Sequence, residues 1–278
     1  MFRLQFRNEL RKLFGKKRTY IGFGAFFLAQ NLMCVFLRFS KAQGDLETLL
    51  ASNGYVAENY MSALTIAVYM LIPQILLLMP LYTTLVGGDM VAKEAEDGTL
   101  RMILSRPVSR FRLMLLKWLT GVVFSFLLVL ALGVIAVGIA RLWFPWRGMF
   151  VFIPEMVFSV MDADNGLKLY ACSQCFLATN AVVAFSLAFM FSCFNMKPAA
   201  ATILALSVLF LNVVMDMLPF FERYREYFLP HHLRSWLYVF AQPTPWGRLG
   251  ESQCVLLGVA LTVFIIGTAA FQMRDIKS

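Results

Sequence analysis

The feature that most constrains this chain is a set of six long apolar blocks separated by charged or polar segments. A bilayer core about 30 Å thick needs about 20 apolar helical residues to cross it, and a helix satisfies every backbone hydrogen bond inside such a block. Strands of a membrane barrel are shorter and alternate apolar with polar residues, a pattern that these blocks lack. We therefore predict an all-α transmembrane fold that forms a single domain over residues 1–278. The expected spans are residues 19–37, 61–87, 113–140, 169–195, 198–218 and 252–273.

The composition and the motifs of the sequence restrict the classes of function that this chain can have. Hydrophobic residues make up 60% of the chain and charged residues 15%, too few polar groups to coat a water-soluble globule. No GxxxxGK[ST] phosphate loop occurs, so the chain is not expected to bind and hydrolyse ATP by that route. His231 and His232 are adjacent and would point about 100° apart on a helix, which disfavours a shared metal site. Cys172 and Cys175 have CxxC spacing but lie at a membrane boundary without a second pair. We expect that this chain is not an enzyme and that it binds no metal or cofactor.

The basic residues predict the orientation in the membrane. An even number of spans places both termini on the same side, and 16 of the 25 Lys and Arg residues fall on that side. Most of these lie in residues 1–18 and 93–117. The positive-inside rule then predicts that both termini are cytoplasmic and that the protein is a multi-pass component of the inner cell membrane. The net charge of +9 thereby reflects topology, and no nucleic-acid partner is expected.

The first sixteen residues predict an amphipathic helix that lies in the headgroup plane. Its apolar residues recur at helical spacing, and three arginines form a parallel stripe one residue further round, a pattern typical of helices on anionic lipid. The alternative is an ordinary basic flank to the first span. The apolar set is Phe2, Phe6, Leu10 and Leu13, and the basic set is Arg3, Arg7 and Arg11.

Three longer segments are expected on the outer side. Residues 40–58 are polar, whereas residues 143–168 and 219–251 combine aromatic residues with prolines, so we expect short helices in the outer leaflet for these two. Asp216, near the outer end of the fifth span, is expected at the interface near Arg223 or Arg225 rather than in a substrate path. Polar residues inside the spans are expected to bond across helices. They are Gln30, Asn31, Gln74, Asn180 and Asn212.

The loop between the second and third spans carries much of the charge in the sequence. Residues 93–96 can extend the second helix beyond the membrane, and Gly98 is a helix stop because glycine tolerates the left-handed conformation. Thr99 can cap a short new helix, which Arg106-Pro107 would end and after which Ser109 can cap the third span. One face of this short helix would be apolar, at i, i+3 and i+4 spacing. Its residues are Leu100, Ile103 and Leu104.

The sequence of this loop resembles that of a known family. The run EAEDGTL at residues 94–100, followed by LSRPVSR at 104–110 and then Lys117, resembles the signature of ATP-binding-cassette permeases of the type-2 class. The ending FQMRDI at residues 271–276 is similar to the usual end of that family. The amphipathic N-terminus resembles the elbow helix that precedes its first span. Six spans and short outer helices before the last span are similar too, so that the resemblance covers essentially the whole chain.

The resemblance implies a permease subunit that couples ATP hydrolysis on a separate ATPase subunit to export. Two ATPase subunits, which carry ATP and Mg²⁺, would assemble with this chain and a second permease subunit, identical or different. A cytoplasmic coupling helix over residues 91–105 would dock on the ATPase. Glu94, Glu96 and Asp97 would make its ionic contacts, Gly98 and Thr99 would shape its turn, and Leu100, Ile103 and Leu104 would make its apolar contacts.

Several alternatives stay open at this point. The loop could be a solvated segment whose charges only set topology. The chain could be a membrane anchor that transmits ATPase motion to an extracytoplasmic partner, as in metalloenzyme maturation, without moving a substrate. An ion-coupled transporter is disfavoured, because few ionisable residues lie inside the spans. No residue identifies a substrate.

Overall fold

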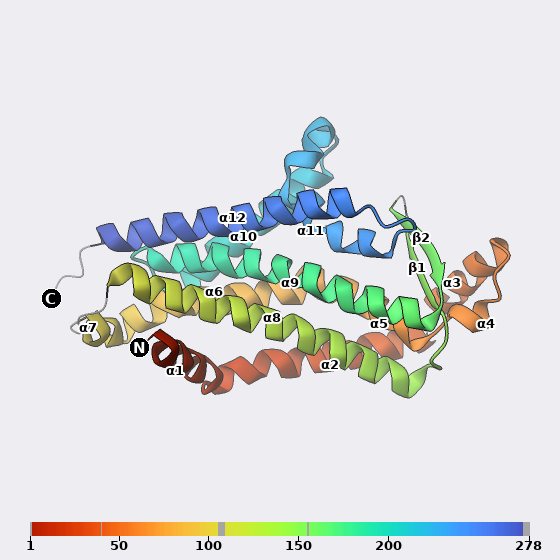
Figure 1. Ribbon diagram of the computed structural model, residues 1–278, viewed down its shortest axis with the longest axis horizontal. Helices are drawn as coiled ribbons and strands as arrows, with labels where there is room; N and C mark the ends of the chain where they lie inside the picture. The colour runs from red at the N-terminus through yellow and green to blue at the C-terminus, as the bar shows by residue number, and fades with distance from the viewer. Residues whose placement is uncertain (1, 40, 105–108, 155, 275–278) are drawn as a thin grey trace.

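The computed structural model describes residues 2–39, 41–104, 109–154 and 156–274, and their side chains except those of residues 18, 41–43, 101 and 104. Six of its helices are long and apolar enough to cross a membrane, so the expected six-helix membrane fold is confirmed. They lie roughly side by side in one elongated bundle (Figure 1). The spans are α2 (Lys17–Phe39), α5 to α6 (Ala63–Pro73 and Met79–Glu96, joined by the π-helical segment η1, Gln74–Leu78), α8 (Arg110–Trp143), α9 (Ala163–Cys193), α10 (Pro198–Met217) and α12 (Trp246–Met273).

Several spans are longer than a membrane requires, and two of them are the longest. Both the α5–α6 span and α8 contain 34 residues, which corresponds to about 50 Å at 1.5 Å per residue, against about 30 Å of hydrocarbon. At one end of the bundle these helices meet α1 (Phe2–Phe14), α7 (Thr99–Leu104) and the described C-terminus, and we name this the α7 end (Figure 1). The two chain ends therefore lie at the same end of the bundle, as an even number of spans requires.

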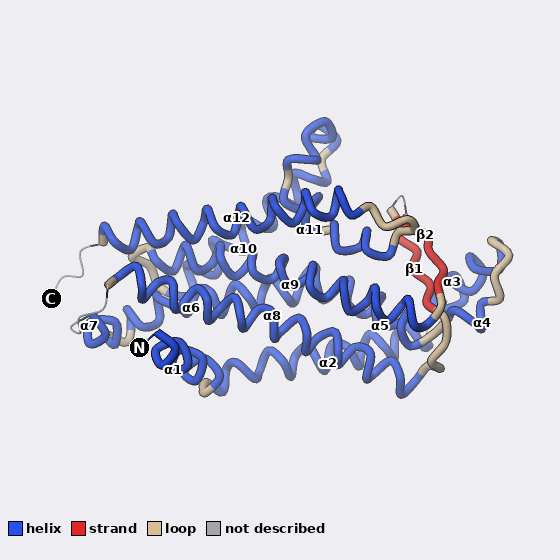
Figure 2. The backbone as a smooth tube through the Cα atoms, in the orientation of Figure 1, coloured by secondary structure: helices blue, strands red, loops and turns tan. Residues whose placement is uncertain are grey.

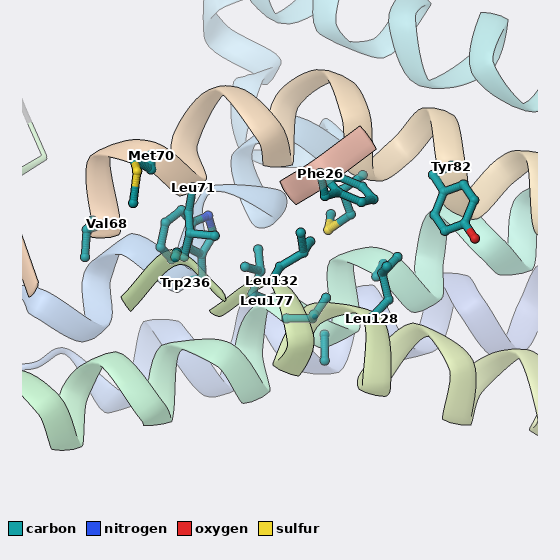
Figure 3. Packing of buried hydrophobic residues seen from close by; sticks show 14 of the residues in the cluster. Phe26, Val68, Met70, Leu71, Tyr82, Leu128, Leu132, Leu177 and Trp236 are labelled. Carbon is teal, nitrogen blue, oxygen red and sulfur yellow. The ribbon is translucent and has the colours of Figure 1, made fainter. Parts of the chain in front are cut away.

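Helix α9 is the central element of the core, because 78% of its most apolar window is buried, against 28% for α2 and 17% for α10. Small residues permit its close packing. A Cβ added to Gly87 of α6 would lie 2.6 Å from the carbonyl oxygen of Phe185, so only glycine allows the two backbones to approach this closely. Apolar side chains from α2, α5, α8 and α9 meet in the same core (Figure 3).

The expectation of short helices over residues 143–168 is wrong. Strands β1 (Met149–Ile153) and β2 (Val157–Met161) pair as an antiparallel hairpin, with Met149 opposite Met161. They lie at the end of the bundle opposite α7, which we name the hairpin end (Figure 2). Both runs are rich in β-branched and aromatic residues, which favour strands.

The hairpin is also held by the second span. The hydroxyl of Tyr69 accepts a hydrogen bond from the backbone N–H of Phe152 at 3.1 Å, and the hydroxyl of Thr65 accepts one from Phe150 at 2.9 Å. These bonds satisfy backbone groups of β1 that the two-stranded ladder leaves unpaired. Beside the hairpin lie α3 (Lys41–Ser52) and α4 (Ala57–Tyr60), in the first outer segment.

Short helices before the last span are confirmed. They are η2 (Pro219–Tyr227), α11 (Leu229–Leu233) and η3 (Ser235–Phe240). Asp216 lies near Arg225, as expected, because the Arg225 side chain donates to the backbone carbonyl oxygen of Asp216 at 3.2 Å. The carboxylate of Asp216 pairs with another residue, Arg234, at 2.8 Å. The chain therefore folds back after η2 and brings Arg234, 18 residues away, against the end of α10.

The polar residues inside the spans divide into two groups. Gln30 and Asn180 do bond to other elements, donating to the carbonyl oxygens of Leu132 and Leu233. Asn31 and Asn212 instead donate to carbonyl oxygens of their own helices, four residues earlier. Neither side-chain amide atom of Gln74, which is buried, has a hydrogen-bond partner among the described residues. Gln74 is also the first residue of the π-helical segment, a geometry that often marks functional positions.

Candidate functional site

The helical turn between α6 and α7 forms as the sequence predicts. Helix α6 ends at Glu96, and Gly98 has φ +71°, the left-handed conformation that closes a helix without penalty at glycine. The predicted cap by Thr99 is not observed among the described residues: Thr99 is the first residue of α7, and its hydroxyl donates to the carbonyl oxygen of Glu94 at 3.3 Å, whereas a capping hydroxyl would accept from an N–H of α7. The expected cap on α8 is confirmed, because the Ser109 hydroxyl accepts from the backbone N–H of Arg112. The expected stop at Arg106-Pro107 lies outside the described residues.

The acidic edge of this turn is exposed. Glu96 and Asp97 have side chains that are 45% and 51% accessible to solvent, and both pair with Lys93, at 2.9 and 3.3 Å. Exposed ion pairs of this kind contribute little to stability, because water and salt screen them. The two carboxylates are therefore at the surface of the α7 end, where a cationic partner could replace the contact with Lys93.

The apolar residues of α7 do not all face outward, although the sequence predicts that they make the contacts with a partner. Leu100 is only 2% exposed and packs into the core of the protein itself, and Ile103 is partly buried against the same core. The side chain of Leu104 lies outside the described residues. Met102 is 67% exposed. One face of α7 thus anchors the turn to the bundle, while Met102 is the apolar side chain that faces outward.

Glu94 lies in a cluster of four charges, in which Glu94 and Lys117 are buried, Glu9 is largely buried and Lys12 is 42% exposed. Its carboxylate pairs with Lys117 of α8 at 2.8 Å and also with Lys12 of α1, and Lys117 pairs with Glu9 of α1 at 3.2 Å. The Lys117 side chain is 1% exposed and that of Glu94 is 8% exposed. We name Glu9, Lys12, Glu94 and Lys117 the four-charge cluster. It joins α1, α6 and α8 directly behind α7.

The physical character of the four-charge cluster follows from its burial. Removing one partner from a buried ion pair typically costs about 3–5 kcal/mol, because the other charge is left uncompensated away from water. Two carboxylates and two ammonium groups compensate each other here. For Lys12, burial alone would lower the pKa, but its hydrogen bond with Glu94 and the negative charges of Glu94 and Glu9 together outweigh that effect and raise the pKa above the ordinary lysine value. Lys12 therefore stays charged at neutral pH.

Sequence reasoning missed this cluster, although one signal was present. Lys117 lies inside the predicted third span, residues 113–140, and an ionisable residue within a span calls for a partner. Lys12 was assigned only to topology and Glu94 only to an external contact. The cluster depends on α1 returning to pack on α8, which no local pattern reveals.

A second contact set closes the same end of the bundle. Arg110, at the start of α8, donates to the carbonyl oxygens of Gln272 and Arg274, each at 3.0 Å, and Arg274 donates to the side chain of Asn195 in the link between α9 and α10. Two of the sequence fragments that carry the resemblance, LSRPVSR and FQMRDI, are therefore in contact through Arg110. The residues of FQMRDI after Arg274 lie outside the described part.

Comparison with known proteins agrees with this arrangement. The family described as "ABC-2 family transporter protein" matches residues 6–246, most of the chain, including α7 and the whole four-charge cluster. No curated protein matches the chain. Members of this family are the membrane subunits of ATP-binding-cassette transporters and are not themselves the ATPase. The chain therefore belongs to the ABC-2 family of transporter membrane proteins.

Proposed function

We propose that this chain is the permease subunit of an ATP-driven exporter and that the α7 end is where a separate ATPase subunit grips it. The observation that carries the proposal is the combination, in one turn, of an exposed acidic edge at Glu96 and Asp97 with the four-charge cluster. An exposed edge offers contacts to a partner. The four-charge cluster behind this edge would transmit a displacement of the edge to α1, α6 and α8.

Within this proposal the predicted coupling residues take two roles. Lys93, Glu96, Asp97 and Met102 form the outward surface that would contact the ATPase, because all are at least one-third exposed. Glu94 and Leu100, which were expected to make such contacts, would instead transmit movement, because they face the interior of the protein. Gly98 shapes the turn, and Ile103 lies at the boundary between the two groups.

The contacts suggest how movement would spread. A push on α7 displaces the end of α6, which Glu94 joins to α8 through Lys117 and to α1 through Lys12. Helix α8 is an unbroken α-helix, whereas the second span contains a π-helical segment between Pro73 and Met79. The second span would therefore bend at η1 while α8 moves as one rod. Changes of this kind, amplified between packed elements, are how small shifts become large ones.

The remaining partners belong to the same proposal. ATP and Mg²⁺ would be bound by the ATPase, present in two copies, and a second permease subunit would complete the complex. Helix α10 supports that last point, because only 17% of its most apolar window is buried within this chain. The α7 end would face the cytoplasm of a cell with an inner membrane, which agrees with the predominance of basic residues at this end.

A second candidate function has an observation of its own. The hydrogen bonds that β1 donates to the hydroxyls of Tyr69 and Thr65 tie the second span to the hairpin end, so that this span joins the α7 end to the opposite end of the bundle. A chain built this way could transmit ATPase motion to a partner beyond the membrane without moving a substrate. Reconstitution with the ATPase separates the two functions, because only the exporter gives nucleotide-dependent flux.

The contact surface is tested by charge reversal. The double variant Glu96→Lys with Asp97→Lys should abolish copurification with the ATPase while leaving insertion into the membrane unchanged. Glu222→Lys with Glu226→Lys, at two exposed positions of η2, is the matched control, because it also reverses two carboxylates, away from the α7 end. Undiminished copurification and ATPase stimulation in the double variant would contradict the proposed contact.

A further inference from the structure

Helix α2 and the second span line a groove that no side chain of the described residues fills. The groove has a volume of about 220 Å³ and lies between residues of α2 on one side and residues of η1 and α6 on the other. Its wall contains one polar group, the Tyr82 hydroxyl, which already donates to the backbone carbonyl oxygen of Thr19. An occupant must therefore be apolar. The lining residues are Ile21, Gly22, Ala25, Phe26, Leu78, Leu81, Tyr82 and Leu85.

The groove is open to the side of the bundle. Ile21 and Leu81, on its two walls, are 68% and 50% exposed, and both belong to segments that cross the membrane. At the base of the groove the two helices pack closely, because Gly22 has no side chain. A Cβ at Gly22 would lie 2.1 Å from the ring of Tyr82. Lipid tails of the bilayer are in direct contact with such an opening.

A smaller hollow lies next to the groove toward the α7 end, and Leu85 lines both. The mouth of this hollow includes Lys16, which is exposed, and Asp89, which takes part in an interaction of its own. The neighbouring helix α1 carries further exposed basic residues. An apolar slot beside the ammonium group of Lys16 at the start of a span fits a hydrocarbon tail with an anionic phosphate headgroup.

We propose that this groove is a binding site for one anionic phospholipid, with an acyl chain between α2 and α6 and the phosphate beside Lys16. The lipid would complete the packing between these helices, where the protein itself leaves a gap. It would also hold α2, and with it α1 of the four-charge cluster, against the second span. This site is independent of the ATPase contact and does not require that any substrate be moved.

The test measures retained lipid. The full-length chain, purified in detergent, is incubated with dioleoyl-phosphatidylglycerol or with dioleoyl-phosphatidylcholine, and bound lipid is counted by native mass spectrometry. The wild-type chain should retain one phosphatidylglycerol in preference to phosphatidylcholine. Ala25→Leu should fill the groove and abolish retention. Lys16→Gln should weaken it about fivefold, which corresponds to one lysine acting on an anionic headgroup.

Matched variants guard against general effects. Gly24→Leu adds the same side chain as Ala25→Leu one residue earlier on α2, where the position is open and outside the groove. Lys17→Gln removes a neighbouring charge that does not line the hollow. Both controls should retain the lipid as the wild type does. Equal retention of the two lipids, or retention by Ala25→Leu at the wild-type level, would overturn the proposal, and a Lys16→Gln variant that binds no worse than Lys17→Gln would do the same.

Discussion

Replacing Lys117 with methionine tests whether the four-charge cluster is a unit. The Lys117 ammonium is 1% exposed and contacts Glu94 at 2.8 Å and Glu9 at 3.2 Å. Its loss leaves Glu9 without that ammonium and leaves Glu94 with Lys12 alone. Removal of one partner from a buried pair costs about 3–5 kcal/mol, which is about a hundredfold to a few thousandfold in the folding equilibrium at 1.4 kcal/mol per tenfold.

The assay is equilibrium unfolding of the full chain in detergent micelles, followed by circular dichroism. Lys93→Met is the matched control, because it makes the same change at an exposed lysine of the same region, where little effect is expected. Apolar replacement of all four cluster residues should recover most of the stability, since no buried charge then remains unpaired. An unfolding midpoint for Lys117→Met that equals that of Lys93→Met would refute this account of the cluster.

Three further predictions follow from single sites. Gly121→Ala should destabilise the protein by about 1–3 kcal/mol, because the new Cβ would lie 1.7 Å from the buried Phe185 ring. Gly138→Ala, at an open position on the same helix, should leave the stability unchanged. Equilibrium unfolding of the two variants tests this difference. Gln74→Leu should raise stability in the same assay by about 1–3 kcal/mol, since it removes two buried amide atoms without partners; a loss of stability would argue against that reasoning. Burial first, and the neighbouring His231 second, lower the pKa of His232 below its ordinary value. The unfolded chain then binds more protons near pH 6.5, so stability should fall as the pH drops through that value, and His232→Gln should flatten this part of the unfolding-versus-pH curve.

The spans and the turn before α7 could be predicted because their signals are local. Six apolar blocks of the right length leave the backbone few alternatives to membrane-spanning helices. Gly98 adopts the positive φ that a helix stop requires, and Ser109 caps α8, as each residue type suggests. Helices α8, α9 and α12 begin three to six residues before the expected spans, whereas α6 continues to Glu96, as the sequence predicts.

The hairpin and the four-charge cluster could not be predicted because each depends on contacts between distant residues. A five-residue apolar run is compatible with a strand or a helix, and the hydrogen bonds of β1 to Tyr69 and Thr65 reach across about eighty residues. Lys12 and Lys117 meet Glu94 only after α1 packs against α8. Charge in the sequence indicated where acids and bases lie, but not which of them are buried together.

The composition of the four-charge cluster has an electrical consequence. Moving one elementary charge through a membrane potential requires about 2.3 kcal/mol per 100 mV. Two glutamates and two lysines in their ionised forms sum to zero, so displacing the cluster as a body does no net work against the field. Within the proposed coupling, the cluster itself would therefore add no voltage-dependent work to a movement delivered at α7.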